Sequence, residues 1–242
     1  SGGLDYAQYW EDRSSGVKAQ SAYGVTSWIP KYVAGVLNGL PIIDFEYRGR
    51  QRAFKWEPRL TDIRTVFWMV KDKGPTQGGG WLLGDTTRVG DFKRGSWGSL
   101  LGNSPLFDAT SAPEVRDGVI HIDGVRCIAD TVPKWDFQVI SLVTTGNVAA
   151  DMIAADRLEY PNWSGLEIGE VIIYTRALSD AECVDTEDYL MSKWLGRRSP
   201  RVVCADTQTV VTASGTVPLY VANIDGAPGT IAAFDGDGEV VI

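Results

Sequence analysis

Short apolar runs alternate with clusters of Gly, Pro, Asn and Asp along the chain, a pattern that predicts many strands joined by turns. The longest run, Ile63–Val70, predicts a central strand of a β-sandwich. Asp123-Gly124 predicts a hairpin turn within Val119–Ile128, with a strand on either side. Residues 85–104 are polar and rich in glycine, so we expect a loop there. Three further runs have the composition of strands: Ile42–Tyr47, Trp81–Gly84 and Trp135–Thr144.

The best-specified stretch runs from Gly169 to Gly196 and joins a strand to a helix. Val171–Tyr174 holds only β-branched and aromatic residues, as expected of a strand that is buried on both faces. Ser179 and Glu182 then form a capping box, in which each side chain can bond the other residue's backbone amide. We expect a helix over 179–195. Its apolar residues at roughly helical spacing are Val184, Leu190, Met191 and Trp194.

This stretch resembles the closing strand and helix of bacterial LamG-like modules, which have the concanavalin A-like jelly-roll fold. The segments Leu37–Phe45, Thr65–Lys71, Trp81–Asp85 and Asp91–Gly95 are similar to the same family, and the similarity covers about residues 5–198. The resemblance implies an all-β jelly-roll β-sandwich with one short C-terminal helix. It also implies a secreted or cell-surface location, because the variant is similar to modules of large surface or autotransporter-like bacterial proteins.

The composition of the chain changes after Pro200. Short β runs continue there, but no Trp follows Trp194. We therefore expect a LamG-like jelly roll over residues 1–198. Residues 199–242 are expected to form a small β appendage, or the start of a truncated following domain. No signal peptide is recognised at the N-terminus, so we expect a mature or excised piece of a secreted protein.

Charge and composition exclude some classes of function. The net charge of −8 disfavours a general nucleic-acid binder, because phosphate contacts need a basic face. No apolar run approaches the about 18 residues of a membrane span, so membrane insertion is not expected. Cys127, Cys183 and Cys204 lack metal-ligand spacing. Cys183 with Cys204 is the nearest pair for a disulfide, and buried or idle thiols are the alternative.

Catalytic patterns are weak in this sequence. Asp44 and Glu46 have the i, i+2 spacing of two acids on one strand face, but a solvated face explains such a pair equally well. His121 is the only histidine, and a lone strand histidine is most often structural. No nucleophile elbow, zinc site, P-loop or dinucleotide signature occurs. The sequence therefore predicts a protein that is not an enzyme.

Aromatic residues in polar segments favour binding of carbohydrate. An exposed aromatic ring can stack on a sugar while carboxylates, amides and Arg bond its hydroxyls. Trp97 and Trp163 lie among Gly, Ser, Asn and charged residues, in segments predicted as loops. Their polar or aromatic neighbours complete the predicted ligand site: Arg88, Asp91, Arg94, Tyr160 and Asn162. In the alternative, each Trp anchors a loop and Asp91 with Arg94 is a structural ion pair. Trp68 and Trp194 are expected in the core.

Calcium is a possible cofactor, because several proteins with this fold bind it on loop carboxylates. Asp85 and Asp91 are the candidate ligands. We expect a non-catalytic extracellular recognition module that binds a glycan or a host-surface ligand and is a monomer as an isolated domain. The first alternative is a structural spacer or protein-binding adhesion module. The second is a glycoside hydrolase or lyase without a recognisable motif.

Overall fold

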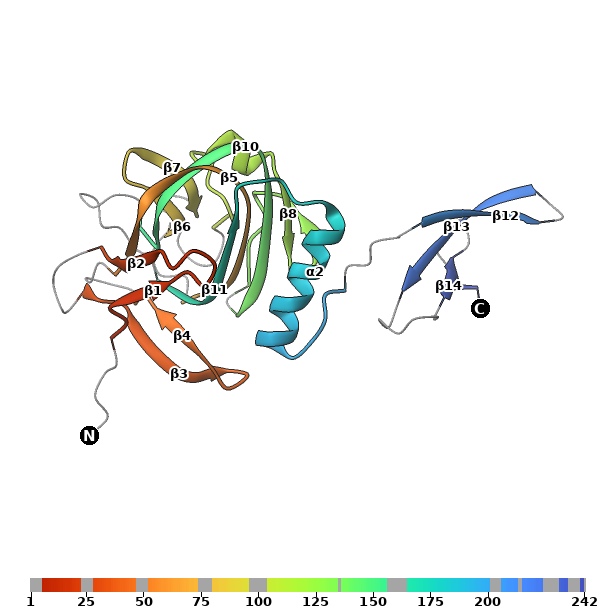
Figure 1. Cartoon of the computed structure of the whole chain (residues 1–242). Coiled ribbons are helices and arrows are strands. Elements are labelled where there is room, and N and C mark those ends of the chain that lie inside the picture. The colour runs from red at the N-terminus through yellow and green to blue at the C-terminus, as the bar shows by residue number, and fades with distance from the viewer. Residues whose placement is uncertain are drawn as a thin grey trace.

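The protein is mostly antiparallel β-structure with one short helix against it (Figure 1). The computed structural model describes residues 6–22, 28–46, 52–73, 80–95, 104–134, 136–155 and 165–200, and the backbone of four later strands. Eleven strands form one hydrogen-bonded sheet. These strands are β1 Tyr9–Glu11, β2 Lys18–Ser21, β3 Lys31–Leu37, β4 Leu40–Asp44, β5 Phe54–Asp72, β6 Gly80–Asp85, β7 Arg88–Arg94, β8 Val119–Ile122, β9 Val125–Cys127, β10 Gln138–Ile153 and β11 Leu166–Tyr174. The helical elements are α1 Pro113–Arg116, α2 Asp180–Leu190 and the π-helical turn η2 Met191–Leu195.

Two long strands, β5 and β10, organise the sheet and arch across it (Figure 1). They pair with each other along most of their length, and their partners on the outer sides change half-way. The second half of β5 pairs with β11, and its first residues pair with β2. The first half of β10 pairs with β8, and its last residues pair with β6. Register shifts between Val143 and Met152 interrupt the pairing where the partners change, as expected of β-bulges that bend a sheet.

The two faces of β5 belong to different cores. Val66, Trp68 and Val70 point into the larger core, which also holds Phe54 and residues of β6 and β7. Phe67 and Met69 point to the other face, where α2 and η2 cover them. Alternation along a strand that is covered on both sides produces the unbroken apolar run seen in the sequence.

Several predicted elements are confirmed. Ile63–Val70 lies inside β5, between β10 and β11. Asp123 and Gly124 join β8 to β9 with φ of 52° and 76°, the left-handed pair that a two-residue hairpin turn requires. The capping box is formed, and α2 with η2 spans 180–195. Trp68 and Trp194 are buried, as predicted for core residues.

The prediction of a loop over 85–104 is wrong for part of that segment. Residues 88–94 form β7, which pairs with β6. The charged residues Asp91, Lys93 and Arg94 of this strand are buried with Phe92. Tertiary partners therefore override a local composition that is typical of loops.

Four strands after residue 200 pair with one another in a second sheet, in the order β12 Asp206–Thr212, β13 Gly215–Asn223, β14 Ile231–Phe234 and β15 Val240–Val241. The boundary between a jelly roll and an appendage at residue 198 stays a prediction. Within the described residues, no helix has both the length and the apolar character to cross a membrane.

Gly169 is a point of close contact between the helical segment and the sheet. The register of β11 against β5 shifts between Ile168 and Glu170, so Gly169 lies at a bulge. A Cβ at Gly169 would lie 2.9 Å from the Trp194 ring and 3.0 Å from Met69 Cγ. Only a residue without a side chain leaves room for the tryptophan at this position of the strand.

The substitution Gly169→Ala is expected to destabilise the protein by about 1–2 kcal/mol. Overpacking costs about 1–3 kcal/mol, and it exceeds the about 0.4–1 kcal/mol gained by restricting the unfolded chain. Urea unfolding should show a lower midpoint with an unchanged slope. The control Ser192→Ala, on the exposed face of the helical segment, should change stability by less than about 0.5 kcal/mol. An unchanged midpoint for Gly169→Ala would contradict the steric argument.

Candidate functional site

Most of the ligand residues predicted from the sequence lie outside the described residues. This holds for Trp97, Tyr160, Asn162 and Trp163. Arg88 lies in β7, but its side chain is also outside the described part of the protein. The predicted site on these loops therefore stays a prediction.

Asp91 and Arg94 are described, and both are buried in β7. They are three residues apart on a strand, so they point to opposite faces. The Arg94 guanidinium is paired with Asp72 of β5, and burial lowers the pKa of Arg94 to about 10. The Asp91 carbonyl accepts a hydrogen bond from the Ala112 amide. In the structure the arginine ties β7 to β5, and the aspartate backbone holds the segment before α1.

Asp85, the other metal candidate, is fully buried and bound to a cation of the protein itself. Its carboxylate accepts from Arg59 Nε at 2.8 Å and from Nη2 at 2.5 Å, and the Thr87 amide donates at 2.9 Å. Burial alone would raise the pKa of Asp85, but the Arg59 and Thr87 hydrogen bonds outweigh it and lower the pKa. No group of three His, Cys, Asp or Glu suited to a metal ion occurs among the residues described. Asp85 therefore fits a structural ion pair better than a calcium site.

The substitution Asp85→Asn is expected to lower the free energy of unfolding by about 2 kcal/mol at pH 7, because Arg59 loses its charged partner. The folded pKa of Asp85 lies below the unfolded value of about 3.9. Its contribution is therefore complete above the unfolded pKa and is lost as the pH falls through the folded pKa. Urea unfolding between pH 7 and pH 3 should show the gap between wild type and variant narrowing. Asp62→Asn, at an exposed position, should show no such trend, and a gap that stays constant for Asp85→Asn would refute this account.

The catalytic candidates of the sequence are held in structural contacts. Asp44 accepts from Lys73 Nζ at 2.7 Å, and Glu46 is paired with Lys31 and Arg52. Both acids are engaged in ion pairs, so their i, i+2 spacing has a structural explanation and does not require a catalytic role.

His121 lies in a buried polar set that sequence reasoning missed. It is the cross-strand neighbour of Ser141, and its Nδ1 is 3.8 Å from Glu187 Oε1. Ser141 Oγ donates to the same Glu187 oxygen at 2.5 Å. All three side chains are buried beneath α2. The Ser141–Glu187 hydrogen bond ties α2 to β10 of the sheet.

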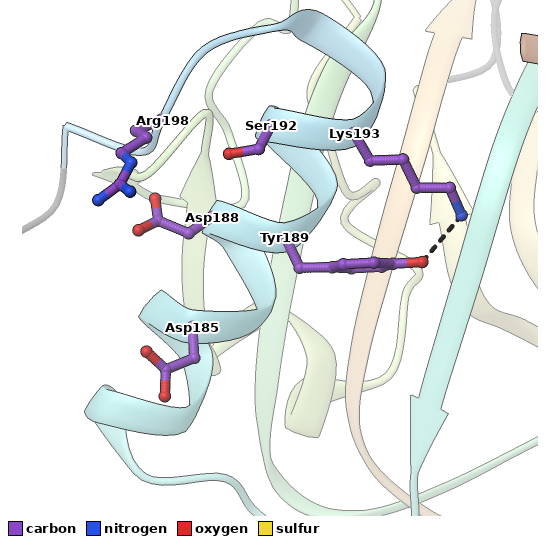
Figure 2. Close-up of a pocket in the computed structure, with 6 residues that line it drawn as sticks. All are labelled: Asp185, Asp188, Tyr189, Ser192, Lys193 and Arg198. Atoms are coloured by element: carbon purple, nitrogen blue, oxygen red, sulfur yellow. Dashed lines mark hydrogen bonds between the residues drawn. The ribbon is translucent and has the colours of Figure 1, made fainter. Parts of the chain in front are cut away.

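An open groove of about 530 Å³ lies on the outer side of α2 (Figure 2). Its lining residues are Asp185, Asp188, Tyr189, Ser192, Lys193 and Arg198. The first four follow the i, i+3, i+4, i+7 spacing that puts side chains on one helix face. The opposite face carries Leu190, Met191 and Trp194 into the core against the sheet.

Tyr189 is the exposed aromatic ring of this groove, with 47% of its surface accessible. Its hydroxyl donates to Glu170 Oε1 at 3.1 Å. It also accepts from Lys193 Nζ at 2.8 Å (Figure 2). Glu170 Oε2 also accepts from Lys193 Nζ at 2.8 Å and from the buried Trp194 Nε1 at 2.7 Å. This network fixes the hydroxyl end of the ring, so the ring is held in one orientation with its side open to solvent.

The charge of Lys193 is secured by the same network. Burial lowers the pKa of Lys193, but the hydrogen bonds to Glu170 and Tyr189 outweigh it, and the net pKa is raised. Lys193 is therefore protonated throughout the physiological range. Its positive charge is matched by Glu170, which lies just behind the groove.

The chain passes along the groove as it leaves the helical segment. Gly196 adopts φ of 65° and ends η2 in a left-handed turn. Asp188 Oδ1 then accepts from the Ser199 amide at 2.6 Å. Arg198 comes to lie beside Asp188 across the groove (Figure 2).

This groove offers an aromatic ring, carboxylate acceptors, a hydroxyl and cationic donors around one open volume. The depression is shallow and open to solvent. The spacing of its residues was visible in the sequence. A polar outer face is common to surface helices, however, and gave no signal of a site.

Comparison of the chain with models of known families, with curated proteins and with solved structures found no match. The resemblance to LamG-like modules therefore stays a prediction.

Proposed function

We propose that this chain is a non-catalytic extracellular recognition module that binds glycan in the groove beside α2. The observation that carries the proposal is the exposed Tyr189 ring, which Glu170 and Lys193 hold in place among hydrogen-bonding side chains. A fixed aromatic ring loses little conformational entropy when a ligand stacks on it.

The chemistry of the groove matches that of a sugar. A pyranose has an apolar C–H face that stacks on an aromatic ring, and hydroxyls around its edge that both donate and accept. Asp185 and Asp188 can accept from such hydroxyls, and Arg198 can donate to them. The Ser192 hydroxyl can do both.

For the fold we propose the LamG-like jelly-roll sandwich with the concanavalin A-like arrangement. Its support is the antiparallel pairing, the two arched strands β5 and β10, and the capped helix that follows the closing strand. The secreted or cell-surface location follows from the same resemblance, and so does an origin in a large bacterial surface protein.

A structural spacer or protein-binding adhesion module is the main alternative, and a glycoside hydrolase or lyase is the second. A spacer has no need of an ordered aromatic ring in an open polar groove. Hydrolysis is favoured only by the presence of two carboxylates, Asp185 and Asp188, in the same groove.

A glycan array with the purified chain tests the proposal. We expect a set of bound glycans whose affinity falls at least about tenfold in Tyr189→Ala, equivalent to about 1.4 kcal/mol of lost stacking. Tyr189→Phe keeps the ring and should retain more of the affinity. Tyr32→Ala removes an exposed tyrosine of β3 and is the matched control.

Other outcomes separate the alternatives. Binding that is lost in Trp97→Ala or Trp163→Ala, but kept in Tyr189→Ala, would place the site on the predicted loops instead. Release of new reducing ends from a bound glycan would favour a hydrolase. No binding to any glycan, with or without calcium, would sink the proposal in favour of the spacer.

A further inference from the structure

The turn between β3 and β4 holds the pair Asn38-Gly39. Both residues are exposed, and their φ angles of 49° and 75° are those of a two-residue hairpin turn. Leu37 pairs directly with Leu40, so only these two residues form the turn. A Cβ at Gly39 would meet no atom within 4 Å. Among the residues that the structure describes, none accepts a hydrogen bond from the Gly39 backbone amide. The Gly39 nitrogen is therefore uncrowded and accessible.

The Asn38 side chain connects this turn to the end of the helical segment. Its Nδ2 donates to the Lys193 carbonyl at 2.8 Å. The last carbonyls of a helical segment lack partners within it, so the Asn38 amide satisfies one of them. Leu37 and Leu40, on either side of the turn, pack against the apolar cluster that includes Trp194. The side-chain amide therefore helps to dock the hairpin on η2.

We propose that Asn38 is a site of spontaneous deamidation. The Gly39 backbone nitrogen attacks Cγ of Asn38 as it loses its proton, and a bond forms between that nitrogen and Cγ. The Cγ–Nδ2 bond breaks, and the side-chain nitrogen takes up the proton and leaves as ammonia. Water then hydrolyses the cyclic imide at either of its carbonyls, which yields an aspartyl or an isoaspartyl residue. Glycine favours the attack, because it has no Cβ beside the nitrogen and its backbone is conformationally free.

Either product replaces the amide donor by a carboxylate next to the Lys193 carbonyl. A carboxylate and a carbonyl are both acceptors, so the helix carbonyl loses its partner and meets a negative charge. The isoaspartyl product also lengthens the main chain within a two-residue turn that fixes the register of β3 against β4. The reaction therefore loosens the hairpin from η2. This consequence does not rest on the proposed function.

Peptide mass mapping of the purified chain after incubation at pH 8 tests the proposal. Asn147 of β10 is the internal control, because it is also exposed but precedes the buried, β-branched Val148. We expect aspartyl and isoaspartyl forms to accumulate at Asn38 at least about tenfold faster than at Asn147, equivalent to about 1.4 kcal/mol in activation free energy. The rate should rise with pH, because the attacking nitrogen must lose its proton.

Two variants separate the reaction from its effect on the fold. Gly39→Ala strains the turn but meets no neighbouring atom, and its methyl group should slow conversion of Asn38 at least about tenfold. Asn38→Asp carries the aspartyl product from the start and tolerates the left-handed turn, so it should lower the urea midpoint with an unchanged slope. Asn147→Asp adds the same charge at the control position and should leave the midpoint unchanged.

Two results would overturn the modification site: equal rates at Asn38 and Asn147, or a rate at Asn38 that Gly39→Ala does not slow. An unchanged midpoint for Asn38→Asp would refute the loosening of the hairpin, even if Asn38 is converted.

Discussion

The contact between Trp194 and Gly169 is the constraint on which the rest of the described arrangement depends. The indole ring lies directly on the backbone of β11, and its Nε1 donates to Glu170, the next residue along that strand. One residue without a side chain thus sets the distance between helix and sheet. The neighbouring carboxylate sets the position along the strand. The same carboxylate then orients Tyr189 and Lys193. The geometry of the groove therefore depends on the packing of Trp194 against Gly169.

Helix α2 faces two chemically different surroundings. Its inner face carries apolar residues together with Glu187, which bonds Ser141 and lies near His121. A buried carboxylate needs such partners, and they also fix the rotation of the helix about its axis. That rotation decides which residues reach the solvent. The rotation of α2 about its axis therefore places Glu187 against Ser141 and His121 and also leaves the groove residues in solvent.

The local parts of the fold could be predicted from the sequence, whereas the parts made by distant partners could not. The capping box at Ser179 and the hairpin at Asp123-Gly124 depend on neighbouring residues, so their signals are local. The strand β7 was missed because Arg94 is compensated by Asp72, far away in the chain. The extent of β5 was missed because the polar residues around Glu57 break the apolar run. Trp194 was recognised as a core residue, but the groove was not, since nothing in the sequence links Tyr189 to Glu170.

The hydrogen bond from the Ser199 amide to Asp188 anchors the chain next to the groove. Beside it, Arg197 is paired with Asp123, and a Cβ at Gly124 would collide with Ser199 and Pro200. These contacts hold the outgoing chain between the end of the helical segment and the turn at Asp123 and Gly124. Asp188 therefore lines the groove and also anchors the chain that leaves the helical segment.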